Sequence, residues 1–203
     1  VGRADPIRNA EHNSFRHIGE FEANYSLTDT VASVSQTSRQ HVPLYFLALN
    51  VWSHLAGNSL EMLRTLSVLF GLLTVASGYR LASWLLSSHQ AGFFVAFMMS
   101  TCTYFLFYTH ETRMYTLLPL LTIGLYATYW HVVSSTQPIQ GRYWLVLYLV
   151  STALIYTHYV GIFALIAIGF YHLVAVKKDR RWLQVVAIMA LASCNSKEKS
   201  EVK

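Results

Sequence analysis

Tyr108-Thr-His-Glu-Thr-Arg-Met-Tyr115 is a short charged segment between two long apolar runs, Ala91–Phe107 and Thr116–Val133. Each run has the length and composition of a membrane span. The charged segment therefore places Glu111 and Arg113 at or near a bilayer surface, where an ionisable side chain is costly and usually has a use. Acidic and basic groups at such a surface indicate chemistry on a charged, lipid-linked substrate.

The composition of the whole chain favours an all-α, polytopic membrane protein. Its 203 residues are 54% hydrophobic and only 12% charged, against roughly 25% charged residues in ordinary soluble domains. The apolar stretches are continuous rather than alternating, which argues against a β-barrel. The net charge of +5 does not form a basic surface with stacking aromatics, so nucleic acid is not an expected partner. Cys102 and Cys194 lie in or beside apolar runs and are interpreted as core residues rather than as a disulfide or a metal site.

We expect four parts along the chain. Residues 1–43 are predicted to be an extracytoplasmic first loop with an acidic motif, residues 44–57 an amphipathic helix in the membrane interface, residues 58–192 a partial transmembrane domain, and residues 193–203 a polar tail. The chain starts at Val1 and ends in a polar run unlike anything before it, so we interpret it as a fragment.

The amphipathic helix is predicted at Leu44–Ala56. Thirteen residues rise about 20 Å as a helix, which is short of the roughly 30 Å hydrocarbon core. Polar residues recur at helical spacing and form one stripe, which consists of Asn50, Ser53, His54 and Gly57. A helix of this kind is expected to lie in the interface rather than to cross the bilayer.

About six spans are predicted in this fragment. They are Leu60–Leu86, Ala91–Phe107, Thr116–Val133, Tyr143–Tyr156, Val160–Val176 and one that begins at Trp182–Ala192. The densest basic cluster, Lys177–Arg181, is expected in the cytoplasm by the positive-inside rule. Counting spans from there places the first loop, the charged segment and Thr157–Tyr159 together on the extracytoplasmic face.

Four motifs in order resemble membrane glycosyltransferases of the GT-C superfamily. They are His41-Val-Pro-Leu-Tyr-Phe46, Arg64 at the start of a span, the charged segment, and Tyr156-Thr-His-Tyr159. The chain is most similar to the group related to protein O-mannosyltransferases (glycosyltransferase family 39) and to bacterial lipid A aminoarabinose and galacturonic acid transferases. It departs from that pattern at Phe21, where the family often has Asp before Glu, and at Val42, which replaces the first proline of His-Pro-Pro.

The resemblance implies transfer of a sugar from a polyprenyl-phosphate donor to a lipid, glycan or protein hydroxyl outside the cytoplasm, within an integral membrane protein. Such a reaction needs a carboxylate that takes the hydroxyl proton. It also needs a cation beside the phosphate, and arginine suits that role because its planar fork donates two bonds and stays charged.

The candidate site residues follow from these needs. Glu22 is the first choice for the catalytic base and Glu20 the second, and a solvated loop carboxylate is the alternative for each. Arg113 is the choice for the phosphate, with Glu111 neutralising and aiming it, and a headgroup anchor is the alternative. Further candidates for substrate binding are His41, Arg64, His158 and Tyr115. The alternative for the two histidines is a structural role. The alternative for Arg64 is a headgroup anchor, and that for Tyr115 is membership of the interfacial aromatic belt.

No cofactor is predicted. Glu22, His41 and His158 could in principle hold a divalent ion, but no metal-ligand spacing supports it, so a metal is not predicted although it is not excluded. Two other functions stay open. A transporter or flippase subunit would place charges or broken helices at mid-bilayer, whereas a non-catalytic membrane scaffold would leave the charged residues on one face without a purpose.

Overall fold

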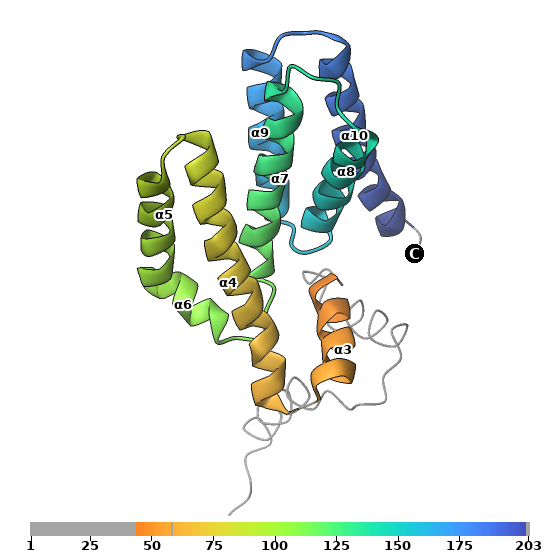
Figure 1. Cartoon of the computed structure of the whole chain (residues 1–203). Coiled ribbons are helices and arrows are strands. Elements are labelled where there is room, and N and C mark those ends of the chain that lie inside the picture. Colours follow the sequence, from red (N-terminus) through yellow and green to blue (C-terminus); the bar gives the residue numbers. More distant parts are fainter. Residues whose placement is uncertain (1–43, 58, 202–203) are drawn as a thin grey trace, which may run out of the picture.

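The computed structural model describes residues 44–57 and 59–201, with side chains as far as Cys194. This part of the chain is helical, without a strand (Figure 1). In order, its helices are α3 (Leu44–Ala56), α4 (Leu60–Leu85), α5 (His89–Thr101), α6 (Thr103–Thr109), α7 (Leu117–Ser134), α8 (Gly141–Ile155), α9 (Gly161–Ala175) and α10 (Arg180–Glu201).

The helices form two groups that meet along α4 and α7. Helices α7 to α10 run alternately up and down in Figure 1. Helices α5 and α6 lie on the side of α4 that faces away from α7, and α3 lies near the first turns of α4. The charged segment and the turn between α8 and α9 therefore lie toward one end of the helices. The loops from α4 to α5, α7 to α8 and α9 to α10 lie at the opposite end (Figure 1).

Local sequence signals explain where several helices begin. The hydroxyl of Ser59 accepts a hydrogen bond from the Met62 amide at the start of α4, and the hydroxyl of Ser88 accepts one from the Ala91 amide at the start of α5. Asp179 does the same for α10, because its carboxylate accepts from the Trp182 amide at 2.8 Å. Each cap satisfies an amide that has no partner within its own helix.

Two of the predicted spans are confirmed as helices long and apolar enough to cross a membrane. They are α4, with 26 residues, and α7, with 18 residues. Their bounds lie close to those that the apolar runs predict.

The second predicted span is broken. Helices α5 and α6 meet at an angle of 66° with Cys102 between them, so together they count as one bent span or a re-entrant segment. Neither proline nor glycine lies at the break. The hydroxyl of Thr101 instead donates to the Phe97 carbonyl at 2.9 Å, a side-chain bond that competes with the helical ladder and often bends a helix.

The prediction of about six spans is therefore corrected to two, or three if the bent pair counts as one, within the described residues. Helices α8 and α9 have 15 residues each, which corresponds to about 22 Å against the roughly 30 Å of a hydrocarbon core. Helix α10 begins with two arginines and has a mostly polar C-terminal part, so it does not meet the same criterion.

Helix α3 has the predicted bounds, but its polar stripe is divided. Asn50 and Ser53 are buried, His54 is exposed, and the apolar Leu55 is 77% exposed. A hydrophobic period shows which residues share a face, but it does not show which face the neighbouring helix covers. Here part of the polar face packs inward, and apolar side chains remain on the surface.

Two clusters of buried side chains hold the helices together. The larger one joins α7, α8, α9 and α10 around Leu125, Leu147 and Leu154. The smaller one joins α3 and α4 to the charged segment and the start of α7, and its members are Tyr45, Leu49, Leu63, Leu66, Met114 and Leu117. Many large apolar side chains outside these clusters are exposed, as expected of helices that face lipid.

Candidate functional site

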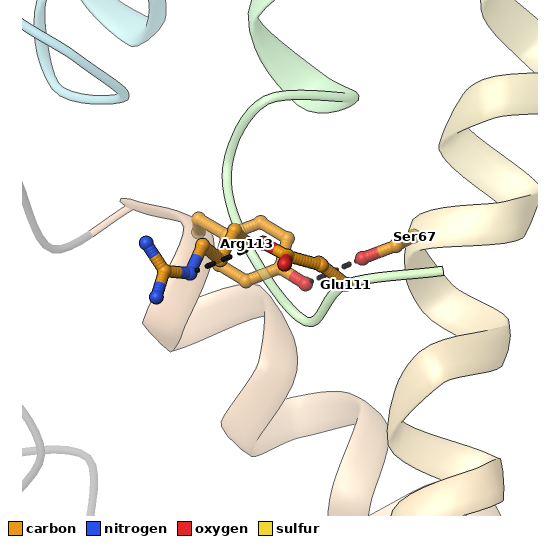
Figure 2. Close-up of polar contacts among 4 residues, drawn as sticks. Ser67, Glu111 and Arg113 are labelled. Atoms are coloured by element: carbon orange, nitrogen blue, oxygen red, sulfur yellow. Dashed lines mark hydrogen bonds and ion pairs between the residues drawn. The ribbon is translucent and has the colours of Figure 1, made fainter. Parts of the chain in front are cut away.

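The charged segment turns the chain between α6 and α7 and presents its charges outward. The Nε atom of Arg113 lies 3.4 Å from Oε2 of Glu111, and the two side chains are 54% and 36% exposed, respectively (Figure 2). The Arg113 amide also donates to the Glu111 carbonyl at 2.9 Å. An exposed pair of this kind contributes only about 0–1 kcal/mol to stability, so an incoming anion can compete for the guanidinium at little cost.

The same segment is fixed from the inside by the residues that follow Arg113. The side chain of Met114 is 1% exposed and belongs to the smaller core cluster. The carbonyl of Thr116 accepts a hydrogen bond from the hydroxyl of Thr74 on α4 at 3.3 Å. Arg113 therefore extends from an anchored backbone, which limits the positions that its guanidinium can reach.

Helix α3 is attached to the same end of the structure. Its first amide, that of Leu44, donates to the carbonyl of Tyr156 at the end of α8. The hydroxyls of Tyr45 and Ser67 lie 2.7 Å apart and connect α3 to α4, and Tyr45 belongs to the same core cluster as Met114 of the charged segment. Burial raises the pKa of the Tyr45 phenol to about 12, and the bond to Ser67 acts in the opposite direction.

The turn between α8 and α9 carries His158, which is buried with 7% of its surface exposed. Its Nδ1 accepts a hydrogen bond from the Val160 amide at 3.1 Å, so the neutral ring carries its proton on Nε2. Gly161 follows at a point where α9 passes against α8. A Cβ atom there would lie 2.7 Å from the carbonyl oxygen of Leu154, so the close turn requires glycine.

Tyr115 joins the charged segment to this turn. Its ring centroid lies 6.0 Å from that of His158 and 4.3 Å from that of Tyr108. The contacts continue to Tyr104 on one side, at 4.6 Å from Tyr108, and to Tyr159 on the other, at 4.4 Å from His158. We call these five rings the aromatic row. It connects α6 and the charged segment, which adjoin in the sequence, to the α8–α9 turn, which comes after α7 and α8.

The candidates from the sequence therefore fall into three groups. Arg113, Glu111, Tyr115 and His158 come together at one end of the helices. Arg64 is exposed on the second turn of α4 and forms no ion pair within the described part of the chain. Glu20, Glu22 and His41 lie outside the described residues.

Tyr104 is a member of the aromatic row that the sequence interpretation missed. Tyr104 and Tyr108 are four residues apart, so they share a face of α6, and this spacing was the available signal. The prediction of Ala91–Phe107 as one straight span hides this spacing, because Tyr104 then lies within the span and Tyr108 after it. The contact between Tyr115 and His158 has no signal in the local sequence, because it depends on how α7 and α9 pack.

Among residues 44–57 and 59–194, no group of three histidine, cysteine or acidic side chains could hold a metal ion. Of the three residues considered as metal ligands, only His158 lies in that part of the chain. What the site does present is one half-exposed guanidinium with a single exposed partner, beside tyrosine and histidine rings. This combination suits an anionic group attached to a ring-shaped, hydroxylated molecule.

Comparison with known proteins gives one result. The family model described as dolichyl-phosphate-mannose-protein mannosyltransferase matches residues 40–195, which include the charged segment, the α8–α9 turn and His41. No curated protein and no solved structure matches the chain. The match covers most of the chain, and the apolar helices agree with an integral membrane protein. The chain belongs to the dolichyl-phosphate-mannose-protein mannosyltransferase family, whose members are membrane glycosyltransferases.

Proposed function

We propose that this protein transfers a sugar from a polyprenyl-phosphate donor to an acceptor hydroxyl on the extracytoplasmic side of a membrane. The observation that carries the proposal is the position of Arg113. It is anchored through Met114, extends outward, and is paired only with the exposed carboxylate of Glu111 within the described part of the chain. The family supports glycosyl transfer, and the donor, the acceptor and the membrane face are our inference.

In the proposed reaction, the acceptor hydroxyl attacks the anomeric carbon of the sugar. The new C–O bond forms as the bond from that carbon to the phosphate oxygen breaks, and the polyprenyl phosphate leaves with the bonding electrons. Arg113 stabilises the charge that builds on the phosphate. Glu111 holds the guanidinium in place before the donor binds. When the donor is bound, the phosphate replaces part of the contact between Glu111 and the guanidinium.

The proton of the acceptor hydroxyl passes to a carboxylate that acts as general base. Glu22 is our candidate and Glu20 the alternative, on the resemblance of the first loop to the acidic motif of the family. His158 lies beside Tyr115 at this end of the helices, and we assign it to the part of the site that binds the donor. Tyr115 contacts His158 and restricts the position of its ring.

The experiment that tests this proposal is a transfer assay on the full-length protein in membranes with a polyprenyl-phosphate sugar. The double variant Glu20→Gln, Glu22→Gln should lose transfer by about 100-fold or more, with unchanged membrane insertion. The matched control is Glu11→Gln, an acidic residue of the same loop outside the motif. Full activity in the double variant would remove the acidic loop from the mechanism.

A transporter is the second candidate function, and the bent pair α5 and α6 is the observation that favours it, because broken helices are common at transport sites. It predicts movement of a lipid-linked sugar across a sealed vesicle without formation of a glycosylated acceptor. A product that carries the sugar in a new covalent bond decides for the transferase.

A further inference from the structure

A cavity of about 430 Å³ lies at the opposite end of the helices from the charged segment. Its walls are the loop between α7 and α8, with Pro138 and Ile139, the first turns of α8, with Trp144, and the start of α10. Figure 1 shows this loop and the start of α10 at the same end. The glycosyl transfer proposed above does not use this cavity.

Two consecutive arginines line the cavity and have different surroundings. Arg181 donates to the carbonyl of Val132 at 3.3 Å, to that of Gln137 at 3.1 Å, and to that of Ser135. It therefore holds the loop wall in place. Arg180 is exposed and has no ion-pair or hydrogen-bond partner within the described part of the chain. Its full set of donors is available to a ligand.

The acidic residue in the cavity is already engaged. Asp179 accepts the Trp182 amide at 2.8 Å and so caps α10, where the helix dipole partly offsets its negative charge. Lys177 and Lys178 directly precede it and are exposed. The lining and its approach therefore carry a net positive charge, which favours an anion with several acceptor oxygens.

The surroundings point to a lipid rather than to a soluble anion. The cavity adjoins the loop that follows α7, the helix confirmed as a candidate span. Next to the cavity, α8 and α10 pack against each other and expose large apolar side chains, among them Leu145 at 57% and Leu183 at 62%. The indole of Trp144, at the cavity wall, is a side chain typical of the membrane interface.

From this arrangement we propose that the cavity binds the phosphate headgroup of an anionic phospholipid, with Arg180 as its principal contact and the acyl chains along α8 and α10. Basic pockets beside transmembrane helices bind lipid headgroups in this way, and the loop after the candidate span α7 forms one wall of this cavity. This inference does not depend on the identity of the donor or of the acceptor.

Binding of a dansyl-labelled phosphatidylglycerol to the detergent-solubilised full chain tests the proposal, with energy transfer from tryptophan as the signal. Arg180→Gln should weaken binding by about fivefold, the effect of one basic residue near a lipid surface. Gln184→Glu, which places a negative charge in the cavity wall, should weaken it as well. The matched control is Arg142→Gln, because Arg142 is exposed at the same end and rests on the Tyr143 ring without lining the cavity.

Two further arms separate the sources of the anion. Labelled phosphatidylcholine should bind clearly more weakly than phosphatidylglycerol, and inorganic phosphate should not displace the bound lipid. Unchanged binding in Arg180→Gln would overturn the proposal, because Arg180 would then not contact the headgroup. An equal loss in Arg142→Gln would also overturn it, because the positive charge at this end would then act diffusely rather than in the cavity. Displacement by inorganic phosphate would overturn the assignment to a lipid.

Discussion

Arg113 and Arg181 lie at opposite ends of the same helices and do different things. The guanidinium of Arg181 donates to three backbone carbonyls in the loop after α7. That of Arg113 meets a single, partly exposed carboxylate and is itself half-exposed. An arginine whose donors are occupied by carbonyls holds a loop in place, whereas one with a single exposed partner can exchange that partner for a phosphate.

The comparison also explains why charge alone is a poor guide to the site. The basic cluster at Lys177–Arg181 holds most of the cations at its end of the helices. One of its arginines, Arg181, nevertheless uses its donors to hold the loop after α7. The charged segment holds a single arginine, but its backbone is fixed through Met114 and its rings reach His158. Anchoring next to an exposed charge distinguishes the candidate site.

The largest expected effect is that of Arg113→Ala on transfer. Loss of a cation that stabilises a developing charge should lower the transfer rate about 100- to 1,000-fold, while the melting temperature changes little because the lost pair is exposed. Arg113→Lys should recover part of the rate, since lysine keeps the charge but loses the planar fork. A collapse of thermal stability in Arg113→Ala would mean that this arginine resembles Arg181 after all.

Arg181→Ala should show the reverse pattern. The loss of hydrogen bonds from a charged donor to the loop after α7 should lower the free energy of unfolding by about 3 kcal/mol. The rate of transfer per folded molecule should stay within about twofold, since Arg181 is remote from the charged segment. Denaturation in detergent and a transfer assay on the same preparation measure both quantities. A selective loss of transfer would contradict the structural role.

Gly161→Ala tests whether the α8–α9 turn must be rigid to position His158. The new Cβ would lie 2.7 Å from the Leu154 carbonyl oxygen. Overpacking of this kind should lower the free energy of unfolding, measured by denaturation in detergent, by about 2 kcal/mol. Gly169→Ala is the matched control, because it lies in the same helix and its Cβ meets nothing within 4 Å. The control should be neutral or slightly stabilising. Equal effects in the two variants would show that the turn is not constrained.

The smallest effect is expected from Tyr45→Phe, which should cost about 1 kcal/mol because Ser67 loses its partner. The pKa of the Tyr45 phenol is raised by burial to about 12, against an ordinary value of about 10. The neutral phenol therefore contributes stability that is fully present below pH 10 and is lost as the pH rises toward 12. Denaturation at several pH values should show a loss in the parent protein that Tyr45→Phe reduces.

Tyr129→Phe provides a control at the other end. It removes a buried hydroxyl that lies 2.9 Å from Nδ1 of His172, so it should cost a similar amount of stability. Only Tyr45→Phe should also reduce transfer, because α3 packs against the charged segment. Equal losses of transfer in both variants would indicate a general loss of folding.

Much of the fold follows from the sequence, and particular residues show where it does not. Helices α4 and α7 follow from the length of their apolar runs, and α3 has the predicted bounds. The break at Cys102 could not be predicted from proline or glycine, because neither lies there. It accompanies a hydrogen bond of the Thr101 side chain that could equally occur in a straight helix. The burial of Asn50 depends on which face of α3 its neighbours cover.

In the candidate site, too, features set by local sequence could be predicted, whereas contacts that depend on helix packing could not. Local sequence places Glu111 and Arg113 in one charged turn, and the structure pairs them. The contact of Tyr115 with His158 arises only when α7 and α9 pack, and 43 residues of sequence separate the two rings. The acidic residues assigned as base belong to the first loop, outside the described residues, and their role stays a prediction.

The central claim is that Arg113 exchanges Glu111 for the phosphate of the donor, and the affinity of the full-length protein for a polyprenyl-phosphate sugar tests it most directly. Arg113→Ala should weaken donor binding by about tenfold or more, the effect of losing a charge-assisted bond. Glu111→Gln should leave binding within a few fold, and Arg181→Ala should leave it unchanged. Unaltered affinity in Arg113→Ala, or an equal loss in Arg181→Ala, would contradict the account.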